Sequence, residues 1–217
     1  MAQAENPGRE RILARIRKAL REPAPRHASG AARPIFAPVP EPLDRFQREC
    51  GANNTECIVV PDAGAGAAAV AGVLSSIPTG EIFVQDAPEL RRMADVWRAT
   101  RGIRWSTAGG PAESSQATIT LADVLVAQTG SVFVSSSGGG RGASIVAPVH
   151  IVVASLSQLV PGLDDAFARL RERDAAAKNS MLCLITGSSR TADIEKILVL
   201  GAHGPRRLVV VLVLRPS

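Results

Sequence analysis

The sequence of 217 residues has few of the side chains on which metal and redox sites depend. Its three cysteines and three histidines are Cys50, Cys57, Cys183, His27, His150 and His203. No two cysteines form a C-x-x-C pair, which excludes a disulfide framework and a zinc or iron–sulfur site of the usual spacing. No two histidines lie at ligand spacing either. We therefore expect no metal site in this chain, and buried, inert thiols at Cys57 and Cys183.

Long apolar runs are also missing. No run approaches the length of a membrane span, and residues 1–18 are polar and charged, without the apolar core of a signal peptide. Hydrophobic residues make up 46% and charged residues 21% of the chain, which is ordinary for a soluble globular protein. The sequence therefore predicts a cytoplasmic protein.

The net charge of +5 belongs to the N-terminal arm. Residues 1–33 hold eight Lys or Arg and three Asp or Glu, a difference that accounts for the whole excess. Asn6-Pro7 is a good helix start, and Ile12, Ile16 and Leu20 then fall on one helical face. The arm has no aromatic residue for base stacking, and its arginines do not gather on one face, which argues against nucleic-acid binding. We expect an amphipathic helix at 1–21 that docks on the body or on a second subunit, so that a homo-oligomer is one outcome.

A Pro-rich linker is predicted at 22–42, and a single α/β domain at 43–217. Strands and helices alternate in the first half of this domain, which favours a parallel sheet covered by helices. The expected strands are 57–60, 82–84, 103–105, 122–127, 132–134, 149–154, 181–185 and 208–214. The expected helices are 43–50, 64–77, 88–100 and 163–173. The unbroken apolar run at 181–185 is typical of a strand buried on both faces.

A glycine motif follows the first strand of this domain. Gly64, Gly66 and Ala69 match G-x-G-x-x-A, and Asp86 stands 20 residues after Gly66, which is the outline of a dinucleotide-binding motif. However, residues 61–63 separate the strand from the first glycine by more than a tight turn allows. In a region this rich in Ala and Gly, a chance match remains the alternative.

Two glycine-containing breaks occur in the middle of the chain. Thr129-Gly130 separates two short strands and predicts a tight hairpin or a bulge. The Ser- and Gly-rich stretch 135–142 lacks the Lys-Ser/Thr of a phosphate-binding loop. It is either a lid or anion-binding loop with Arg141 at its tip, or a plain surface loop. His150, near the entrance of the next strand, is more typical of a hydrogen-bonded structural residue than of a catalyst.

The densest polar chemistry follows residue 185. A strand that ends in small hydroxyl residues offers backbone N–H groups to an anion, and Arg190 adds a planar fork of donors. Because ligands of such sheets bind beyond the carboxyl ends of strands, we expect one pocket at that edge, lined by both breaks and this turn. The predicted ligand-binding residues are Thr129, Gly130, Arg141, Thr186, Gly187, Ser188, Ser189, Arg190 and Thr191. Asp193 and Glu195 are candidate catalytic acids, and His150 and His203 are further candidates. The alternative is a capped turn with a solvated helix face, in which one of these acids neutralises Arg190.

These residues together resemble a known family. Ala-Gln-Thr-Gly-Ser (127–131), Pro-Val-His-Ile-Val-Val (148–153), Thr-Gly-Ser-Ser-Arg-Thr-Ala-Asp-Ile-Glu (186–195) and Val-Leu-Gly-Ala-His-Gly-Pro (199–205) follow one another as in LUD-domain proteins. Within that family the chain is most similar to the lactate utilization protein C (LutC/YkgG) group. The resemblance is dense from residue 123 to 214 and loose before it.

The resemblance implies a fold and a role. The fold is that of the NagB/RpiA/CoA-transferase superfamily, a three-layer α/β/α arrangement with a mainly parallel sheet. The role is that of a component in the oxidation of L-lactate to pyruvate, beside partner proteins that carry the iron–sulfur clusters. No cofactor is evident in this chain, and whether it is itself catalytic stays open. The alternative is a free-standing enzyme acting on a phosphorylated or CoA-linked carboxylic acid, with Glu195 or Asp193 as base or nucleophile.

Overall fold

The structure, a computed structural model, describes residues 7–21, 37–111, 113–174, 179–191, 199–201 and 203–215. The chain divides into two compact units, Met1–Ala37 and Pro38–Ser217. In the first unit the predicted helix is present as α1 (Pro7–Ala19). None of the described helices is long and apolar enough to cross a membrane.

The second unit is built on a six-stranded sheet in which every pair of neighbours is parallel. In spatial order its strands are β1 (Thr55–Asp62), β12 (Arg207–Arg215), β7 (Val149–Ser155), β4 (Ala117–Leu121), β2 (Glu81–Val84) and β3 (Gly102–Trp105). The long strand β12 lies between β1 and β7 and is buried from Leu208 to Val213. Its run of valines and leucines is what a strand buried on both faces requires. The predicted parallel sheet is confirmed.

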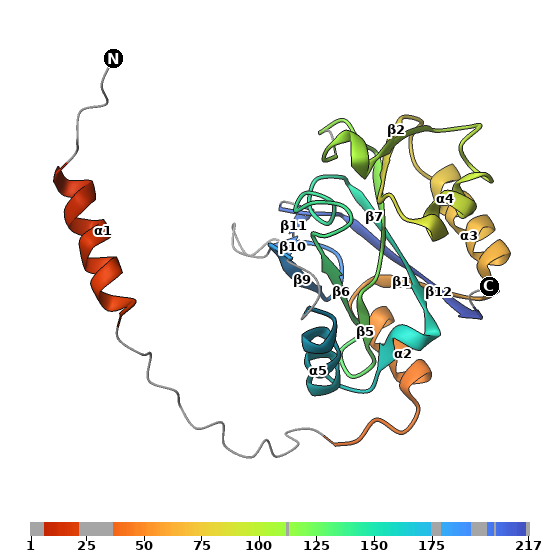
Figure 1. Cartoon of the computed structure of the whole chain (residues 1–217). Coiled ribbons are helices and arrows are strands. Elements are labelled where there is room, and N and C mark those ends of the chain that lie inside the picture. The colour runs from red at the N-terminus through yellow and green to blue at the C-terminus, as the bar shows by residue number, and fades with distance from the viewer. Residues whose placement is uncertain are drawn as a thin grey trace. The chain divides into compact units, whose positions relative to one another are not determined.

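One face of this sheet is covered by α3 (Ala63–Ser75) and α4 (Pro88–Ala94), which lie together in Figure 1. Side chains of these helices and of all six strands form one apolar cluster, in which Trp97 is 1% exposed. The helix predicted at 88–100 is shorter than expected: α4 ends at Ala94, and turns follow it. A single 3₁₀ turn, η1 (Ser106–Ala108), follows β3.

The opposite face is covered by α2 (Pro42–Ala52) and by a second, four-stranded sheet. In spatial order this sheet contains β8 (Leu159–Val160), β5 (Val124–Val126), β6 (Ser131–Ser135) and β9 (Leu182–Ile185). Its outer side packs against α5 (Leu163–Asp174). The α/β class with a mainly parallel main sheet is confirmed, and the second sheet is an addition that the sequence did not predict.

Two strand assignments need correction. The run at 181–185 is not a doubly buried strand: among the described residues β9 is an edge strand that pairs with β6 alone, and Leu184 is 40% exposed. A short apolar run fits an edge strand as well as a central one, because periodicity reports no neighbours. The central strand β4 was missed, because Thr118 and Thr120, both buried, interrupt its apolar pattern.

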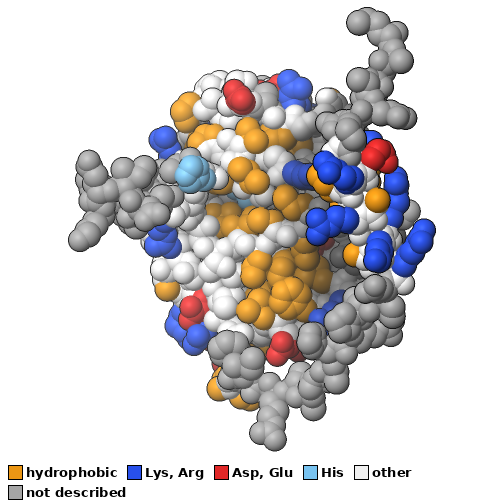
Figure 2. All heavy atoms as spheres, turned by 90° about the vertical axis from the view of Figure 1, so that its left-hand side faces the viewer, with side chains coloured by type: hydrophobic (Ala, Val, Ile, Leu, Met, Phe, Trp, Pro, Cys, Tyr) orange, Lys and Arg blue, Asp and Glu red, His pale blue; other side chains and the backbone are white. Residues whose placement is uncertain are grey.

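Apolar side chains also gather on the outer side of the second sheet. Phe133 of β6 is paired in register with Leu184, and its ring lies 5.5 Å from that of Phe167 in α5. Figure 2 shows hydrophobic side chains forming a patch on the face that it views. Because Phe167 is 43% exposed, this side of the sheet is only partly covered within the described residues.

Candidate functional site

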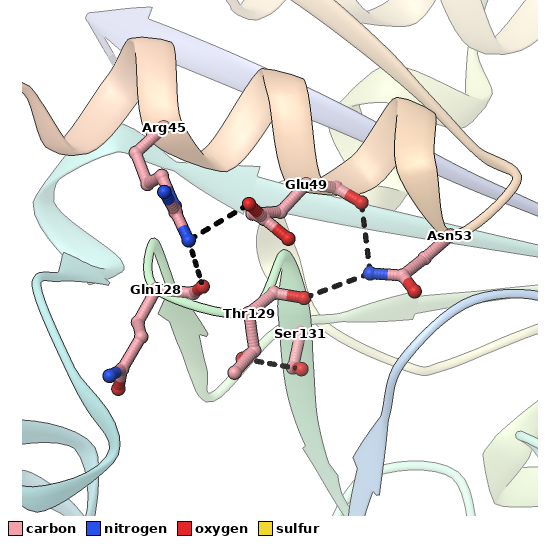
Figure 3. A network of polar contacts seen from close by, with 6 residues as sticks. All are labelled: Arg45, Glu49, Asn53, Gln128, Thr129 and Ser131. Carbon is pink, nitrogen blue, oxygen red and sulfur yellow. Dashed lines mark hydrogen bonds and ion pairs between the residues drawn. The ribbon is translucent and has the colours of Figure 1, made fainter. Parts of the chain in front are cut away.

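The first group of predicted site residues lies at the C-terminal end of α2. Asn53, directly after the helix, donates from Nδ2 to the carbonyl oxygens of Glu49 (2.9 Å) and Thr129 (3.1 Å). Arg45, two turns earlier, pairs with Glu49 at 3.0 Å and donates to the carbonyl oxygen of Gln128 at 3.5 Å. Figure 3 shows these side chains reaching from the helix to the turn between β5 and β6. The predicted hairpin is therefore present and is fastened to α2.

Gly130 makes this close approach between helix and turn possible. Its φ is 62°, and a Cβ atom there would lie 2.6 Å from the backbone nitrogen of Cys50. Gly187 is similar, with a φ of 85° and the carbonyl oxygen of Asn53 against it. Because left-handed backbone and contact with a helix end both favour glycine, packing accounts for the two glycines without a ligand.

A chain of hydroxyl groups joins the hairpin to the polar turn after β9. Thr129 Oγ1 lies 2.7 Å from Ser131 Oγ, which lies 2.6 Å from Thr186 Oγ1. Arg190 Nη2 donates to the carbonyl oxygen of Asn53 at 2.7 Å. A cation at a helix C-terminus is favourable, because the carbonyl groups there carry partial negative charge. The structure thus brings five predicted site residues together around Asn53: Thr129, Gly130, Thr186, Gly187 and Arg190. Asn53 itself was not among the residues predicted from the sequence.

The remaining residues of the polar turn lie beside the Gly201–Pro205 segment. Ser189 donates its backbone N–H to the carbonyl oxygen of Pro205 at 2.9 Å, and its own carbonyl accepts from Gly201 at 2.8 Å. The two short strands β10 (Arg190–Thr191) and β11 (Val199–Leu200) pair antiparallel here. Ser188 is buried, whereas His203 is exposed. Asp193 and Glu195 lie outside the described residues.

This group is at the amino end of the parallel sheet, so the expected pocket at the carboxyl end is wrong for these residues. Asn53 precedes β1, and Pro205 precedes β12. The reason is that β9 does not belong to the parallel sheet. It runs antiparallel to β6 in the second sheet, and its carboxyl end therefore points to the opposite edge.

Arg141 does not join this group. Its loop follows the other end of β6, where Ser136 donates its N–H to the carbonyl oxygen of Met181 at 2.9 Å. The β6–β9 pairing, about 10 Å long from Val132 to Ser135, separates it from the Arg190 turn. The loop is seated on the sheet, with Gly138 against the side chain of Gln85 after β2. Arg141 itself is exposed and lies within 3.4 Å of Ser180 Oγ.

His150 lies inside the molecule, on the face of β7 that packs toward the second sheet. It is 0% exposed, and its Nε2 lies 2.9 Å from Thr120 Oγ1. Its Nδ1 has no hydrogen-bond partner among the described residues. Burial lowers the pKa of His150 to about 4, so the ring is neutral near pH 7.

In the part of the chain that the structure describes, no three His, Cys, Asp or Glu side chains form a group that could hold a metal ion. Cys50 and Cys57 nevertheless interact. A hydrogen bond with Cys57, together with burial, raises the pKa of the Cys50 thiol above its usual range. Cys50 Sγ also lies 3.7 Å from the carbonyl oxygen of Gly130. Cys50 therefore stays protonated and packs as an apolar side chain.

A cavity does occur at the carboxyl edge of the parallel sheet, with a volume of about 430 Å³. Its lining comes from the ends of three central strands and from helices on both sides of the sheet. The lining residues are Ala63, Glu89, Arg92, Met93, Leu121, Val153, Ala154, Ser155, Ser157, Gln158, Arg169 and Val213. We call this cavity the carboxyl-edge pocket. None of the predicted site residues lines it.

Three polar groups of the pocket are held by the turn η2 (Leu156–Gln158) after β7. Ser155 caps this turn, with its Oγ accepting from the N–H of Ser157 and its own N–H donating to Gln158 Oε1 at 2.7 Å. Arg169 of α5 donates from Nη1 to the carbonyl oxygen of Ser157 at 2.6 Å. Arg92 of α4 makes no hydrogen bond or ion pair with any described residue. The pocket thus combines two guanidinium groups and the carboxylate of Glu89 with fixed hydroxyl and amide groups.

The glycine motif at 64–69 lies beside the pocket and has a packing role. The strand β1 runs directly to Asp62, whose carboxylate accepts from the N–H of Ala65 at 2.9 Å and caps α3. A Cβ at Gly66 would lie 3.1 Å from Met93 Cε and 3.2 Å from Val213 Cγ2. Close packing of α3 on the sheet therefore explains Gly66, and the carboxylate of the N-cap residue Asp62 already occupies the N-terminus of the helix.

Sequence comparison places the chain among known proteins. The family model of the LUD domain matches residues 43–213. Lactate utilization protein C of Halalkalibacterium halodurans is 34% identical over 126 residues, 57% of this chain and 54% of that protein. Lactate utilization protein C of Geobacillus kaustophilus is 28% identical over 187 residues, 79% of this chain and 78% of that protein. The chain spans about half the length of the Halalkalibacterium halodurans and Bacillus licheniformis relatives that it matches.

A solved structure is also similar. The crystal structure of a DUF162 family protein from Deinococcus radiodurans matches with a TM-score of 0.63 and covers 79% of this chain and 96% of that chain. At 20% identity this likeness shows the fold alone. The family model, which covers most of the second unit, identifies the relationship: the chain belongs to the LUD domain family.

Proposed function

We propose that this chain is a LutC-like component of a cytoplasmic system that oxidises L-lactate to pyruvate, and that it binds a small anionic ligand in the carboxyl-edge pocket. The name shared by the relatives supports the lactate-utilization role. One observation supports the anion site: Arg92 of α4 and Arg169 of α5 both line a pocket at the carboxyl ends of β4, β7 and β12, against a single acid, Glu89. That edge is where open α/β sheets bind ligands.

The lining suits a carboxylate with an adjacent oxygen. A guanidinium group can bind a carboxylate through two parallel hydrogen bonds. Ser155 and Ser157 offer hydroxyl groups for a neighbouring hydroxyl or keto oxygen, whereas the Gln158 amide is engaged with the Ser155 N–H and the carbonyl oxygen of Ala122. Leu121, Val153 and other apolar residues form most of the remaining wall and lower the local dielectric constant around the ion pair.

The redox chemistry is proposed to reside in partner proteins. The three cysteines of this chain lack the spacing of an iron–sulfur motif, and the resembled group acts beside proteins that have it. Purified chain with L-lactate and an artificial electron acceptor should therefore show no turnover. Measurable oxidation by this chain alone would contradict the assembly proposal and favour a free-standing enzyme.

Ligand binding is tested by calorimetry of the full chain with L-lactate and with pyruvate. Arg169→Ala should weaken binding by about tenfold or more, because a charge-assisted hydrogen bond is lost. Arg171→Ala is the matched control, since it changes the same residue type in the same helix at an exposed position outside the pocket lining. Equal affinity for the parent chain and Arg169→Ala, or equal losses in both variants, would refute the carboxylate site.

A further inference from the structure

A second cavity, of about 490 Å³, lies beside the carboxyl-edge pocket, between α4 and β3. Its lining residues are Arg91, Arg92, Ala94, Asp95, Arg98, Arg101, Ile103 and Trp105. We call it the basic groove. Four of its eight lining residues are arginines and one is an acid, so its positive charge exceeds what its own lining neutralises.

Two of these arginines have structural partners. Arg91 forms two hydrogen bonds with the carboxylate of Asp86, one of them 2.7 Å long, and its guanidinium lies over the ring of Trp105 at 4.6 Å. Arg101 donates to the carbonyl oxygens of Leu74, Ile77 and Pro78 at the C-terminal end of α3. Their donors are therefore largely engaged in the fold.

The other two arginines are available. Arg98 pairs with Asp95 at 3.2 Å, but both side chains are mostly exposed, at 69% and 63%, and such surface pairs are weak. Arg92 has no hydrogen-bond or ion-pair partner among the described residues, and it lines both the groove and the pocket. A ligand that extends from the pocket past Arg92 would therefore enter the groove that Arg98 also lines.

The available charge exceeds that of a simple hydroxy acid. The two cavities are lined by five arginines and two acids, Glu89 and Asp95, and Asp86 pairs with Arg91, so two positive charges remain and one carboxylate neutralises only one of them. The pocket volume, about 430 Å³, lies within the range of sites for ligands much larger than a three-carbon acid. A phosphate group carries up to two charges and three acceptor oxygens, and it matches the guanidinium fork.

We infer that the ligand of the carboxyl-edge pocket carries a second anionic group, a phosphate, which lies in the basic groove between Arg92 and Arg98. This inference rests on the proposed function, because it takes the carboxylate to be in the carboxyl-edge pocket. It assigns the ligand to the phosphorylated carboxylic acids.

The test compares pyruvate with phosphoenolpyruvate as probes, by calorimetry of the full chain at one fixed ionic strength. Phosphoenolpyruvate should bind about tenfold more tightly or better, as expected for an added charge-assisted contact. Arg98→Ala should remove that advantage and leave pyruvate binding unchanged, whereas Arg169→Ala should weaken both ligands. Arg171→Ala should change neither. Because Arg98 is 69% exposed, its variant should fold, which thermal unfolding verifies.

The outcomes separate the two ideas. If Arg169→Ala leaves the binding of both probes unchanged, the proposed anion pocket is wrong. Equal affinity for the two probes, no measurable binding of phosphoenolpyruvate, or an advantage that survives Arg98→Ala overturns the phosphate inference. Inorganic phosphate should compete for the phosphate position in the basic groove. If it removes the tighter binding of phosphoenolpyruvate and leaves pyruvate binding unchanged, the phosphate inference is supported further.

Discussion

At the scale of single residues, His150 makes stability depend on pH. The pKa of its buried ring is lowered to about 4 in the folded protein, from an ordinary value near 6.5. Above pH 6.5 the ring is neutral in both states. As the pH falls toward 4, the unfolded chain takes up a proton that the folded protein refuses. The contribution of the neutral His150 ring to the free energy of unfolding is therefore complete above pH 6.5. It is lost as the pH falls through about 4, and the total loss is about 3 kcal/mol.

Urea unfolding at pH 7, 5.5 and 4.5 measures this effect. The free energy of unfolding should fall between pH 7 and pH 4.5 less steeply for His150→Gln than for the parent chain, since Gln does not titrate. Other groups titrate alike in both proteins and cancel in the comparison. Identical pH slopes would show that His150 is accessible to protons in the folded state.

Arg190 is the second residue-scale question. Its hydrogen bond to Asn53 gives it a structural part, and the proposal that its guanidinium also takes a ligand stays a prediction. Arg190→Lys keeps the charge and loses the planar fork. If Arg190 binds a ligand, the variant should lose function while the free energy of unfolding changes by no more than about 1 kcal/mol, because this contact is exposed. A larger loss of stability, with function following the folded fraction in thermal unfolding, would make Arg190 a structural clamp.

At the scale of elements, the contact between α2 and the β5–β6 hairpin depends on Gly130. Gly130→Ala should destabilise the protein by about 3 kcal/mol or more, because it adds left-handed strain and a collision with the backbone of Cys50. Gly72→Ala is the matched control: it lies inside α3 with no atom within 4 Å of an added Cβ. That change should stabilise by about 0.5–1 kcal/mol. Equal denaturation midpoints for the two variants would contradict this account of the contact.

At the scale of the whole molecule, the basic arm is expected to serve assembly. Ile12, Ile16 and Leu20 are 61%, 49% and 79% exposed, and an isolated helix as short as α1 is marginal in water. Deletion of residues 1–33 should therefore change the oligomeric state, measured by light scattering, or the thermal stability. Salt-sensitive DNA binding by the full chain that disappears on deletion would argue instead for a nucleic-acid arm.

Much of the fold could be predicted from local pattern. The parallel sheet follows from alternating strands and helices, and the central position of β12 agrees with its unbroken apolar run. The hairpin at Thr129-Gly130 follows from the one break between two short strands. These features are properties of adjacent residues, because backbone preference and burial on one or both faces both leave a short-range period. The motifs at 127–131 and 186–195 likewise indicated the LUD domain family, which the family model confirms.

Only the tertiary structure decided which edge of the sheet each polar segment occupies. The run at 181–185 has the composition of a central strand, yet it pairs antiparallel with β6 in a second sheet, and this pairing carries Thr186–Arg190 to the amino edge. Arg92 and Arg169 were passed over because an arginine on an amphipathic helix has the same sequence context whether it faces solvent or a pocket. Strand partners and pocket walls are contacts between distant residues, and composition and period, which are local, do not record them.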